Sequence, residues 1–455
     1  MNRSIFREYD IRGVVATDLV PEVVENIGKA FGSRVISGGG SRIAIGRDVR
    51  LSGEKLLESL SKGVLSTGCD IIDIGRVPTP LLYFSQFHLD VHGGIMITGS
   101  HNPPEFNGFK LLINKKSVHG EEIQKLADEI EKGDFKSGKG NRNNEDVITP
   151  YKKMVKEKIS FARKIKVVID SANGCGGILA PELFKEMGCE VIELFSEPDG
   201  RFPNHHPDPT VEKNMEDLKK AVISHKAELG IGYDGDADRI GVVDELGNQL
   251  HGDHILMVYA KDLLSRVNGA KVIFDVKCSR NLPLYVKKHG GHPIMSATGH
   301  SIIKQRMHDE NAELAGEMSA HIFFGENYFG YDDAIFATAK FLKIVDTAKK
   351  PVSKFLEEIP KTYSTPEIRV DCPDNEKFGL VRELVAFYKS KYRVIDIDGV
   401  RMEFDDGWAL VRASNTQPVL VLRFEAESKE SLAKYKKEVY EKLLTYGPLK
   451  ALQPF

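Results

Sequence analysis

The sequence lacks most features of a secreted, membrane-bound or nucleic-acid-binding protein. It has five cysteines in 455 residues and no C-x-x-C pair, which predicts free thiols in a reducing compartment rather than a disulfide framework. No stretch approaches the roughly 18 apolar residues of a membrane span, and the opening residues MNRSIFREYDIRG lack the apolar core of a signal peptide. The formal net charge is -3 without a long basic run, which argues against nucleic acid as a partner. We therefore expect a cytoplasmic protein with neither a membrane nor a nucleic-acid partner.

One pattern occurs three times, at residues 42–74, 166–194 and 271–295. Each copy has a short β-branched strand, a polar loop, an amphipathic helix and a glycine that opens a second apolar strand. Such βαβ units predict parallel strands in a sheet that is covered by helices. Because ligands of these sheets bind beyond the carboxyl ends of the strands, the polar loops are the places to look for a functional site.

The last 90 or so residues differ from these repeats. Strands are expected at IRVD and VLVLRFEA, helices at KFGLVRELVAFYKSK and KESLAKYKKEVYEKLL, and a hairpin around Asp405, Asp406 and Gly407. The sequence therefore predicts an α/β protein with three similar mixed α/β domains and a smaller C-terminal α+β domain. The predicted domains are residues 1–146, 147–248, 249–360 and 361–455. Two polar segments, residues 133–150 and 196–209, are interpreted as linkers or solvated loops without chemistry.

Three short motifs match ligand-binding loops but lack an essential feature. Residues 133–139, GDFKSGK, have P-loop spacing, but Gly140 stands where Ser or Thr is required. Residues 230–235, GIGYDG, have the G-x-G-x-x-G spacing, but carboxylates follow instead of a helix N-terminus. The acids from Asp234 onward have EF-hand spacing, but Arg239 occupies the position of the turning glycine. These mismatches exclude a P-loop, a dinucleotide site and a calcium sensor.

The segment DGDADR, from Asp234 to Arg239, lies between two apolar strands. Its three alternating carboxylates can converge in a loop and offer the hard oxygen ligands that Mg²⁺ prefers. The alternative is a solvated acidic turn that caps a hairpin. Metal binding is the favoured interpretation because strands on both sides hold the loop.

Three further loops carry polar groups that suit a functional site. Ser100 stands where an apolar strand ends and a proline-stiffened loop begins, a common position for a catalytic residue but also for an ordinary turn serine. RASNTQ, residues 412–417, combines an arginine fork with hydroxyls and an amide and predicts a phosphate clamp, or else a hydrophilic turn. An extended backbone at EMSAH would place Glu317, Ser319 and His321 on one face, toward sugar hydroxyls or simply at a polar strand edge.

Together these segments resemble a known family. TGSHNPPEFNGFK, DGDADR, GEMSAH and RASNTQP occur in the order of the four signature loops of the α-D-phosphohexomutases. The resemblance covers nearly the whole chain and is strongest to the bacterial phosphomannomutase/phosphoglucomutase branch. It implies a monomer with four domains around a central cleft. It also implies reversible conversion of hexose 1-phosphate and hexose 6-phosphate, for mannose and glucose, through a phosphoserine and a hexose 1,6-bisphosphate.

The resemblance also implies a role for each matching residue. Ser100 would be the phosphoserine, and Mg²⁺ would be bound by the Ser100 phosphate with Asp234, Asp236 and Asp238. Sugar hydroxyls would be held by Glu317, Ser319 and His321, and the non-reacting phosphate by Arg412, Ser414, Asn415 and Thr416. Further substrate contacts would come from Tyr9, Arg12, Lys110, Arg239, Lys277 and His300. Glucose 1,6-bisphosphate would serve as activator and intermediate.

Several alternatives stay open at this level. The proton acceptor could be Arg12, His101, Lys110 or His300, with Lys110 and Arg12 as working assignments. The sequence departs from close relatives of the family at Ala320, where glycine is commoner, and at Gln417. Rival functions are a metal-dependent phosphatase, a haloacid-dehalogenase-like enzyme with Asp234 as nucleophile, and a sugar-phosphate-binding protein without turnover. A mutase for another sugar, such as glucosamine phosphate, is a further alternative.

Overall fold

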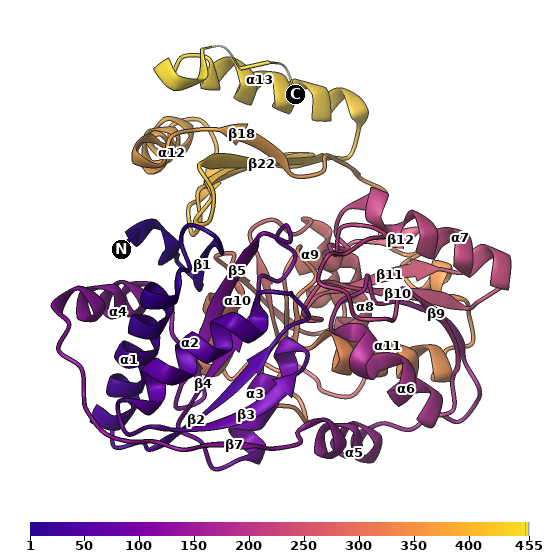
Figure 1. Ribbon diagram of the computed structural model, residues 1–455. Helices are drawn as coiled ribbons and strands as arrows, with labels where there is room; N and C mark the ends of the chain where they lie inside the picture. The colour runs from indigo at the N-terminus through magenta and orange to yellow at the C-terminus, as the bar shows by residue number, and fades with distance from the viewer. Residues whose placement is uncertain (451, 454) are drawn as a thin grey trace.

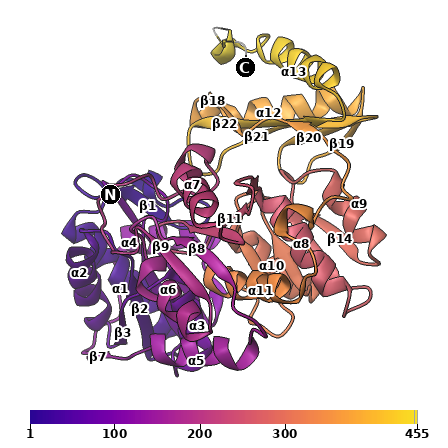
Figure 2. The same cartoon turned by 90° about the vertical axis from the view of Figure 1, so that its right-hand side faces the viewer.

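Three α/β domains lie together, and a C-terminal domain stands above them (Figures 1 and 2). This computed structural model describes residues 1–450, 452–453 and 455. Among the described residues, helices of a length and hydropathy suited to crossing a membrane are not found. The predicted fold class, with three similar mixed α/β domains and a smaller α+β domain, is confirmed.

The first domain contains a mixed sheet in the order β1-β5-β4-β2-β3-β7, with β6 paired to β5. Strands β2, β3, β4 and β7 are parallel, whereas β5 is antiparallel to β4 and to β1. The strands are β1 (Ile11–Val14), β2 (Arg42–Arg47), β3 (Asp70–Arg76), β4 (Gly93–Ile97), β5 (Phe106–Ile113), β6 (Lys116–Ser117) and β7 (Arg142–Asn144). The helices are η1 (Arg3–Ile5), α1 (Pro21–Ser37), α2 (Gly53–Leu65), α3 (Thr79–His88) and α4 (Glu121–Lys132).

The second and third domains repeat this plan with fewer strands. Their sheets have the orders β12-β11-β10-β8-β9 and β14-β13-β15-β16. The second domain comprises α5 (Ile148–Lys158), β8 (Lys166–Asp170), α6 (Gly176–Glu186), β9 (Glu190–Leu194), η2 (Glu212–Met215), α7 (Glu216–His225), β10 (Leu229–Tyr233), β11 (Ile240–Asp244) and β12 (Gln249–Leu250). The third comprises α8 (Gly252–Leu264), β13 (Lys271–Asp275), α9 (Asn281–Lys288), β14 (His292–Ser296), α10 (His300–Glu310), β15 (Leu314–Gly316), β16 (Ile322–Phe324), α11 (Ala334–Thr347) and η3 (Val352–Lys354).

The three predicted βαβ repeats are confirmed as β2-α2-β3, β8-α6-β9 and β13-α9-β14. In each domain a further parallel strand then turns into an antiparallel neighbour, through the pairs β4–β5, β10–β11 and β15–β16. The connection in each pair leaves the carboxyl end of the parallel strand. The serine, acidic and sugar loops predicted from the sequence occupy these three equivalent connections.

The C-terminal domain is an antiparallel sheet in the order β17-β22-β21-β20-β19, with β18 also paired to β22. Its elements are β17 (Tyr363–Ser364), β18 (Ile368–Asp371), α12 (Asp374–Lys389), β19 (Arg393–Ile395), β20 (Val400–Phe404), β21 (Gly407–Ala413), β22 (Val419–Ala426), α13 (Lys429–Leu443) and η4 (Gly447–Leu449). The predicted strands, helices and hairpin of this region are all present. Helix α13 starts at Ser428, whose side chain accepts a hydrogen bond from the amide of Ser431, as an N-cap residue does.

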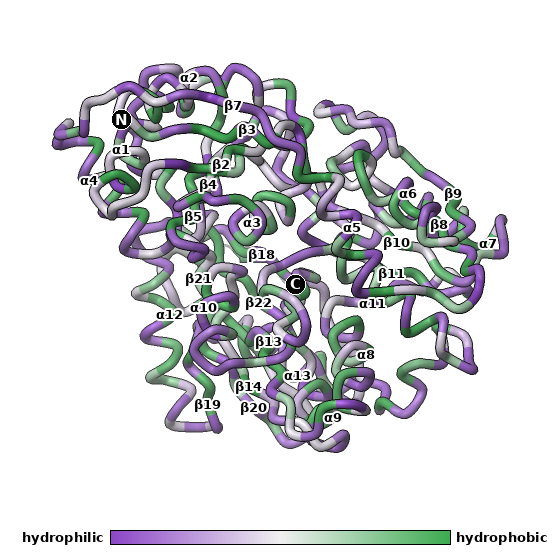
Figure 3. The backbone as a smooth tube through the Cα atoms, turned by 90° about the horizontal axis from the view of Figure 1, so that it is seen from below, coloured by the Kyte–Doolittle hydropathy of each residue, from purple (hydrophilic) through white to green (hydrophobic). Residues whose placement is uncertain are grey.

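Hydrophobic periodicity explains how the helices pack. Helix α4 buries Ile123, Leu126, Ala127 and Ile130, a spacing that forms one stripe, and it ends at Gly133 in the left-handed conformation. Helix α12 alternates between hydrophobic and hydrophilic segments in Figure 3, as expected for a helix with one buried face. Packing of these stripes against the sheets forms the cores.

The first three domains share a continuous core, whereas the fourth has its own. One cluster runs from Leu82 in α3 through Leu183 in α6 to Leu256 in α8. The C-terminal core is separate, and it meets the third domain through a small cluster of Val276, Trp408 and Leu410. The arrangement favours a rigid lower body and an upper domain with a limited apolar junction.

A buried arginine strengthens this junction. Arg401 donates hydrogen bonds from Nη1 to the carbonyl oxygens of Val276 (2.6 Å) and Cys278 (2.8 Å). Its guanidinium lies 3.8 Å from the ring centroid of Trp408, and both side chains are buried. The fourth domain is thus attached by directional bonds as well as apolar contact.

The interpretation of residues 133–150 as a linker is partly wrong. Residues 142–144 form β7, an edge strand in parallel register with β3, and residues 148–150 belong to α5. The residues of β7 are exposed, and the strand is held by backbone pairing with β3 and by an ion pair of Arg142 with Asp73, so it leaves little hydrophobic pattern in the sequence. The free-thiol prediction is confirmed, since all five cysteines are buried and unpaired.

A buried carboxylate joins the second and third domains. Asp333 caps α11 by accepting a hydrogen bond from the amide of Phe336 (2.8 Å). It also accepts bonds from the hydroxyls of Tyr151 (2.8 Å) and Tyr328 (2.6 Å). Burial raises the pKa of Asp333 to about 6 despite these donors. The ionised form therefore costs free energy at neutral pH.

We predict a measurable pH dependence from this residue. Because its folded-state pKa is raised, Asp333 stabilises the fold fully below about pH 4, and this contribution is lost as the pH rises through about 6. The difference between a pKa of about 6 and the ordinary aspartate value corresponds to about 3 kcal/mol. The free energy of unfolding of the wild type minus that of Asp333→Asn should therefore fall by about that amount between pH 4 and 7, measured by urea denaturation.

Asp346→Asn is the matched control for this measurement. Burial opposes ionisation of Asp346, but amide donors from Ala162 and Arg163 lower its pKa, so its pH dependence should have the opposite sign. A difference between wild type and Asp333→Asn that stays constant or rises with pH would contradict the account.

Candidate active site

Ser100 lies in the loop between β4 and β5, where the sequence predicted it. Ser100 is buried and has a φ of +47°, an unusual backbone conformation for a residue other than glycine. The Oγ atom lies 3.0 Å from Oδ2 of Asp234 and 3.1 Å from Nδ1 of His101. The serine of the first domain therefore touches the acidic loop of the second.

The three aspartates of the acidic loop converge as predicted. Asp234, Asp236 and Asp238 are all buried, and their ligand oxygens lie within 4.8 Å of one another. Ala237, at a φ of +57°, turns the chain between them. The amides of Asp238 and Arg239 donate to Oδ1 of Asp234 at 3.1 and 3.2 Å, which fixes the loop.

A lysine of the first domain compensates part of this charge. Nζ of Lys110, on β5, lies 2.8 Å from Oδ2 of Asp236 and also contacts Asp238. Burial opposes the charge on Lys110, but the two carboxylates raise its pKa well above the ordinary value. Burial and the neighbouring carboxylates raise the pKa of Asp234, whereas Lys110 and hydroxyl donors lower that of Asp236 against the effect of burial.

The aspartate cluster suits a divalent cation. Oδ1 of Asp236 and Oδ1 of Asp238 are buried without a hydrogen-bond partner, a costly state for charged oxygens. Hard carboxylate oxygens at this mutual spacing are typical ligands of Mg²⁺. The orphaned oxygens, the third carboxylate and the adjacent Ser100 hydroxyl together fit such an ion.

The predicted extended backbone at EMSAH is wrong. Residues 317–321 form a tight turn between β15 and β16, in which the amide of Ala320 donates to the carbonyl of Glu317 (2.9 Å). Ala320 has a φ of +66°, a conformation for which glycine is better suited. Glu317 and His321 are buried while Ser319 is partly exposed. The turn still brings Glu317 and His321 to neighbouring positions.

His321 is held by two charged partners. Its Nε2 accepts a hydrogen bond from Nε of Arg239 (3.0 Å), so the proton of a neutral ring lies on Nδ1. Nδ1 in turn lies 3.0 Å from Oδ2 of Asp332 and 3.6 Å from Oδ1 of Asp238. The close spacing of Asp238, His321 and Asp332 also resembles a metal site. A protonated Nδ1 is no ligand, so the cluster is interpreted as a positioned histidine.

Asp332 contacts several residues of the site, and the sequence patterns did not single it out. Oδ1 accepts a hydrogen bond from Nζ of Lys304 (2.9 Å), and Oδ2 lies 3.8 Å from Nδ1 of His300. The rings of His300 and His321 stack at 5.6 Å. Burial and neighbouring cations, first Lys304, lower the pKa of His300 well below its ordinary value. The adjacent aspartates of NYFGYDDA carry no spacing pattern that predicts this role for Asp332.

The clamp loop lies between β21 and β22, as predicted. Nε of Arg412 donates to Oδ2 of Asp398 (2.9 Å), and Oγ of Ser414 accepts bonds from the amides of Thr416 (3.3 Å) and Gln417 (3.2 Å). These contacts fix a turn with hydroxyls and a guanidinium in one place. Asp398 is a second residue that the sequence patterns did not single out.

The clamp loop also contacts the first and third domains. Nδ2 of Asn415 donates to the hydroxyl of Tyr9 (2.7 Å), which itself donates to the carbonyl of Thr298 (2.7 Å). Lys277 of the third domain bonds Glu367 of the fourth at 2.6 Å. Tyr9, Lys277 and the clamp therefore meet where three domains come together.

The remaining predicted residues lie beside Ser100. Arg12 donates to Oδ1 of Asn102 (2.8 Å) and forms an ion pair with Asp10. Burial and the neighbouring Arg239 lower the pKa of His101 well below its ordinary value. Every residue predicted for the site thus belongs to the loops that meet here or to their immediate neighbours.

Residues 196–209 form a loop without regular secondary structure, as interpreted from the sequence, but this loop borders the acidic loop. Pro207 packs beside Gly235, where an added Cβ would lie 3.5 Å from Pro207 Cγ and 2.4 Å from the carbonyl of Ser100. The Asp208 charge raises the pKa of Arg239 against its burial. The loop borders the acidic loop because the chain returns here toward α7, a proximity that composition does not reveal.

Comparisons with known proteins agree with this geometry. Models of phosphoglucomutase/phosphomannomutase alpha/beta/alpha domains I, II and III match residues 3–137, 149–247 and 251–363, and the model of the C-terminal domain matches residues 367–442. The chain belongs to the phosphoglucomutase/phosphomannomutase family. Hexose phosphates follow from the family as the class of substrate.

Individual relatives are similar over nearly their whole length. The chain is 45% identical over 434 residues to a phosphomannomutase/phosphoglucomutase of Pseudomonas aeruginosa, covering 95% of this chain and 94% of the relative. It is 44% identical to a phosphoglucomutase of Neisseria meningitidis, covering 94% of each. A crystal structure of a phosphoglucomutase/phosphomannomutase family protein from Burkholderia thailandensis superposes with a TM-score of 0.92 at 39% identity, covering 100% of both chains. The predicted family, fold and enzyme class are confirmed, and the phosphatase alternative is not favoured.

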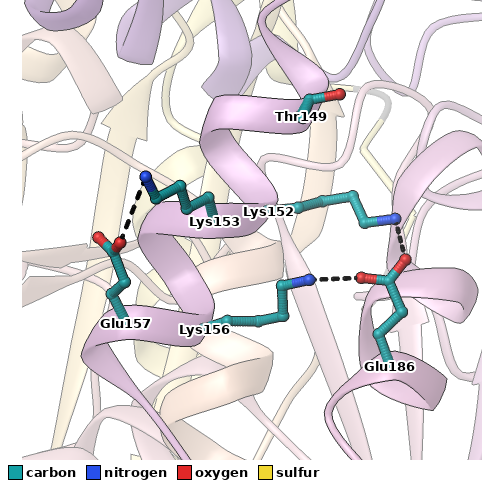
Figure 4. A pocket seen from close by; sticks show the side chains of 6 residues that line it. All are labelled: Thr149, Lys152, Lys153, Lys156, Glu157 and Glu186. Carbon is teal, nitrogen blue, oxygen red and sulfur yellow. Dashed lines mark hydrogen bonds and ion pairs between the residues drawn. The ribbon is translucent and has the colours of Figure 1, made fainter.

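A surface pocket of about 390 Å³ between α5 and α6 is separate from these loops (Figure 4). Lys152 and Lys156 both pair with Glu186, and Lys153 pairs with Glu157. Each lysine of the pocket therefore has a carboxylate partner. We interpret it as a solvated ion-pair surface rather than a binding site.

We predict that Lys110→Met destabilises the protein in the absence of divalent cations. Removing the ammonium leaves buried carboxylates uncompensated, so the free energy of unfolding in EDTA should fall by about 3–5 kcal/mol. Mg²⁺ should restore part of this loss by binding the native state. Lys29→Met, which breaks a partly exposed pair with Glu25, is the control and should cost about 1 kcal/mol or less. Equal stability of Lys110→Met and wild type in EDTA would contradict the account.

Proposed function

We propose that this protein reversibly converts hexose 1-phosphate and hexose 6-phosphate, for mannose and glucose, through a phosphoserine at Ser100 and a hexose 1,6-bisphosphate. The observation that carries the proposal is the position of the Ser100 hydroxyl. It lies 3.0 Å from Asp234 in a buried acidic cluster, at the meeting point of the loops that would hold the sugar and its second phosphate. A nucleophile in this setting suits group transfer, because binding alone does not require it.

In the proposed cycle the Ser100 phosphoryl group passes to the free hydroxyl of a bound hexose monophosphate. The bond between Ser100 Oγ and phosphorus breaks, and a bond between the sugar oxygen and phosphorus forms. The resulting bisphosphate turns over within the site, and Ser100 then takes back the other phosphoryl group. Glucose 1,6-bisphosphate would therefore act both as intermediate and as activator of unphosphorylated enzyme.

Asp234, Asp236 and Asp238, with the Ser100 phosphate, would hold Mg²⁺. The ion would neutralise the charge that develops on the transferred phosphoryl group. Arg239, Lys110 and Arg12 add positive charge around Ser100 (Arg239 and Lys110 through the acidic loop, Arg12 through Asn102). The burial of this region makes each of these charges more effective than it would be in water.

The other loops would hold the remainder of the substrate. Arg412, Ser414, Asn415 and Thr416, with Tyr9 and Lys277, would bind the phosphate that does not react. Glu317, Ser319, His321 and His300 would bind the sugar hydroxyls. Because the same clamp must accept a phosphate at either end of the sugar, donors from hydroxyls and a guanidinium suit it better than a metal.

His321 is better placed to act as the general base than the residues considered from the sequence. The ion pairs of Lys110 keep it charged, and the guanidinium of Arg12 offers only donors and no lone pair for a proton. Nε2 of His321 has its lone pair available once Arg239 turns to a phosphate, and Asp332 faces Nδ1. A carboxylate behind a histidine stabilises the imidazolium that forms on proton transfer. His101 and His300 would then serve as neutral hydrogen-bonding groups.

The cellular setting belongs to the same proposal. Free buried thiols, a near-neutral net charge and small phosphorylated substrates favour a cytoplasmic monomer without nucleic-acid or membrane partners. A different preferred sugar, such as glucosamine phosphate, is the second candidate. Discrimination between these sugars would rest on the sugar loop, where Ser319 is partly exposed beside the buried Glu317.

Phosphorus NMR tests the function directly. Purified protein with Mg²⁺, a trace of glucose 1,6-bisphosphate and mannose 1-phosphate should produce mannose 6-phosphate. Ser100→Ala should lose at least about a thousandfold in rate, because no phosphoryl acceptor remains. Release of inorganic phosphate instead would indicate a hydrolase. An unchanged spectrum with mannose, glucose and glucosamine phosphates would contradict mutase activity.

A second prediction concerns Asp332. Asp332→Asn should lower kcat by about 10- to 100-fold with a smaller change in KM, because the imidazolium of His321 loses its counter-charge. The pH dependence of kcat should shift as well. Asp333→Asn is the matched control, since the next carboxylate faces the tyrosines instead and should leave kcat within about twofold. Equal effects of the two substitutions would show a general structural cause.

A further inference from the structure

Four carbonyl groups in and next to the Ser100 loop accept hydrogen bonds from one buried arginine. Arg50 follows β2 and has a side chain that is 0% exposed. Its Nη1 donates to the carbonyls of Pro103 (2.6 Å) and Phe106 (2.9 Å). Its Nη2 donates to the carbonyls of Ser100 (2.9 Å) and Asn102. One guanidinium therefore satisfies four backbone acceptors between the start and the end of the loop.

A neighbouring carboxylate completes this anchor. Oδ2 of Asp48 accepts a hydrogen bond from the amide of Gly99 (3.1 Å), lies 2.9 Å from Oγ1 of Thr98 and pairs with Nε of Arg50 at 3.2 Å. Oδ1 accepts from the amide of Arg50 (2.9 Å). Asp48 thus accepts hydrogen bonds from the loop, and Arg50 donates hydrogen bonds to it. The charges of the two side chains offset each other.

The anchor is enclosed from two sides by close packing. A Cβ added to Gly99 would lie 2.4 Å from Nε of Arg50, and one added to Gly200 would lie 2.6 Å from Cα of Arg50. The ring of Phe202 lies 5.3 Å from the guanidinium carbon. Gly200 and Phe202 belong to the second domain, so both domains fix the position of Arg50.

This enclosure matters because Ser100 is held in an unfavourable conformation. A φ of +47° costs a non-glycine residue about 1–2 kcal/mol. The chain adopts it only where surrounding contacts over-determine the backbone. A loop that relaxed would turn Oγ away from Asp234.

We propose that Arg50 is a positioning residue for phosphoryl transfer, which holds the strained Ser100 loop so that Oγ faces the acidic cluster. The proposal rests on the function proposed above. Arg50 has no contact with the reacting atoms and acts only through the loop carbonyls. Lysine cannot replace it, because an ammonium lacks the planar fork that reaches four acceptors at once. Misplacement of a reacting atom by about 1 Å can cost about a hundredfold in rate.

Single-turnover transfer separates positioning from stability. Wild type and Arg50→Lys are phosphorylated with glucose 1,6-bisphosphate, and transfer to mannose 1-phosphate is followed by rapid quench at saturating substrate. Arg50→Lys should transfer about a hundredfold more slowly while KM changes less than about threefold. Arg163→Lys is the control, because Arg163 also donates to two backbone carbonyls, of Lys164 and Val345, away from the site. It should keep the wild-type transfer rate.

Each outcome decides the question. A transfer rate for Arg50→Lys within about threefold of wild type, even with a lowered Tm, would overturn the positioning role and leave a purely structural one. If Arg50→Lys does not fold, Gly200→Ala decides, because it presses on the backbone of Arg50 while every side chain of the anchor stays. A tenfold or larger slowing on a folded Gly200→Ala would support the proposal, and an unchanged rate would overturn it. Failure of the wild type to transfer at all would instead refute the proposed function.

Discussion

The site depends on the contacts that the carboxylate of Asp236 makes with the first domain. Its Oδ2 accepts hydrogen bonds from Thr79 (2.6 Å) and Lys110 (2.8 Å) and lies 3.1 Å from Oγ1 of Thr98, all residues of the first domain. Asp236 itself belongs to the acidic loop of the second domain. Three buried carboxylates repel one another and stay together only where cations and donors offset the repulsion. The first domain, which carries the serine loop, supplies those donors from α3, β5 and the end of β4, so the phosphoryl carrier and the acidic cluster form one unit across a domain boundary.

The third domain is attached firmly to this unit, and the fourth domain is attached less firmly. The continuous core of the first three domains keeps the serine, acidic and sugar loops in fixed relation. The fourth domain has a core of its own and meets the others through Arg401 and Trp408 and through polar contacts such as Asn415 with Tyr9. Polar contacts of this kind exchange with water at little cost. A clamp on such a domain suits an enzyme that must release one phosphate and bind another.

Periodic features of the sequence predicted the architecture well. The three βαβ repeats, the strands and hairpin of the C-terminal domain and the position of Ser100 after a buried strand follow from patterns that hydrophobic burial and turns impose. Features that depend on a single side chain or on a distant contact were missed. The edge strand β7, the anchor Arg50 and the counter-charge Asp332 each depend on a neighbour that is distant in sequence, and local spacing does not record such pairs. The local turn at Ala320 was missed because alanine gives no signal for a φ of +66°. The position of Pro207 beside the acidic loop was not predicted, because these segments are also distant in sequence.

Paramagnetic relaxation tests most directly whether the Ser100 phosphate and the aspartate cluster form one site. The protein is phosphorylated at Ser100, Mg²⁺ is replaced by one equivalent of Mn²⁺, and the phosphorus resonance of the phosphoserine is recorded. A shared site predicts severe broadening in the wild type and a sharp resonance in Asp236→Asn at the same Mn²⁺ concentration. A sharp phosphoserine resonance in wild-type protein that has bound its Mn²⁺ would contradict the account.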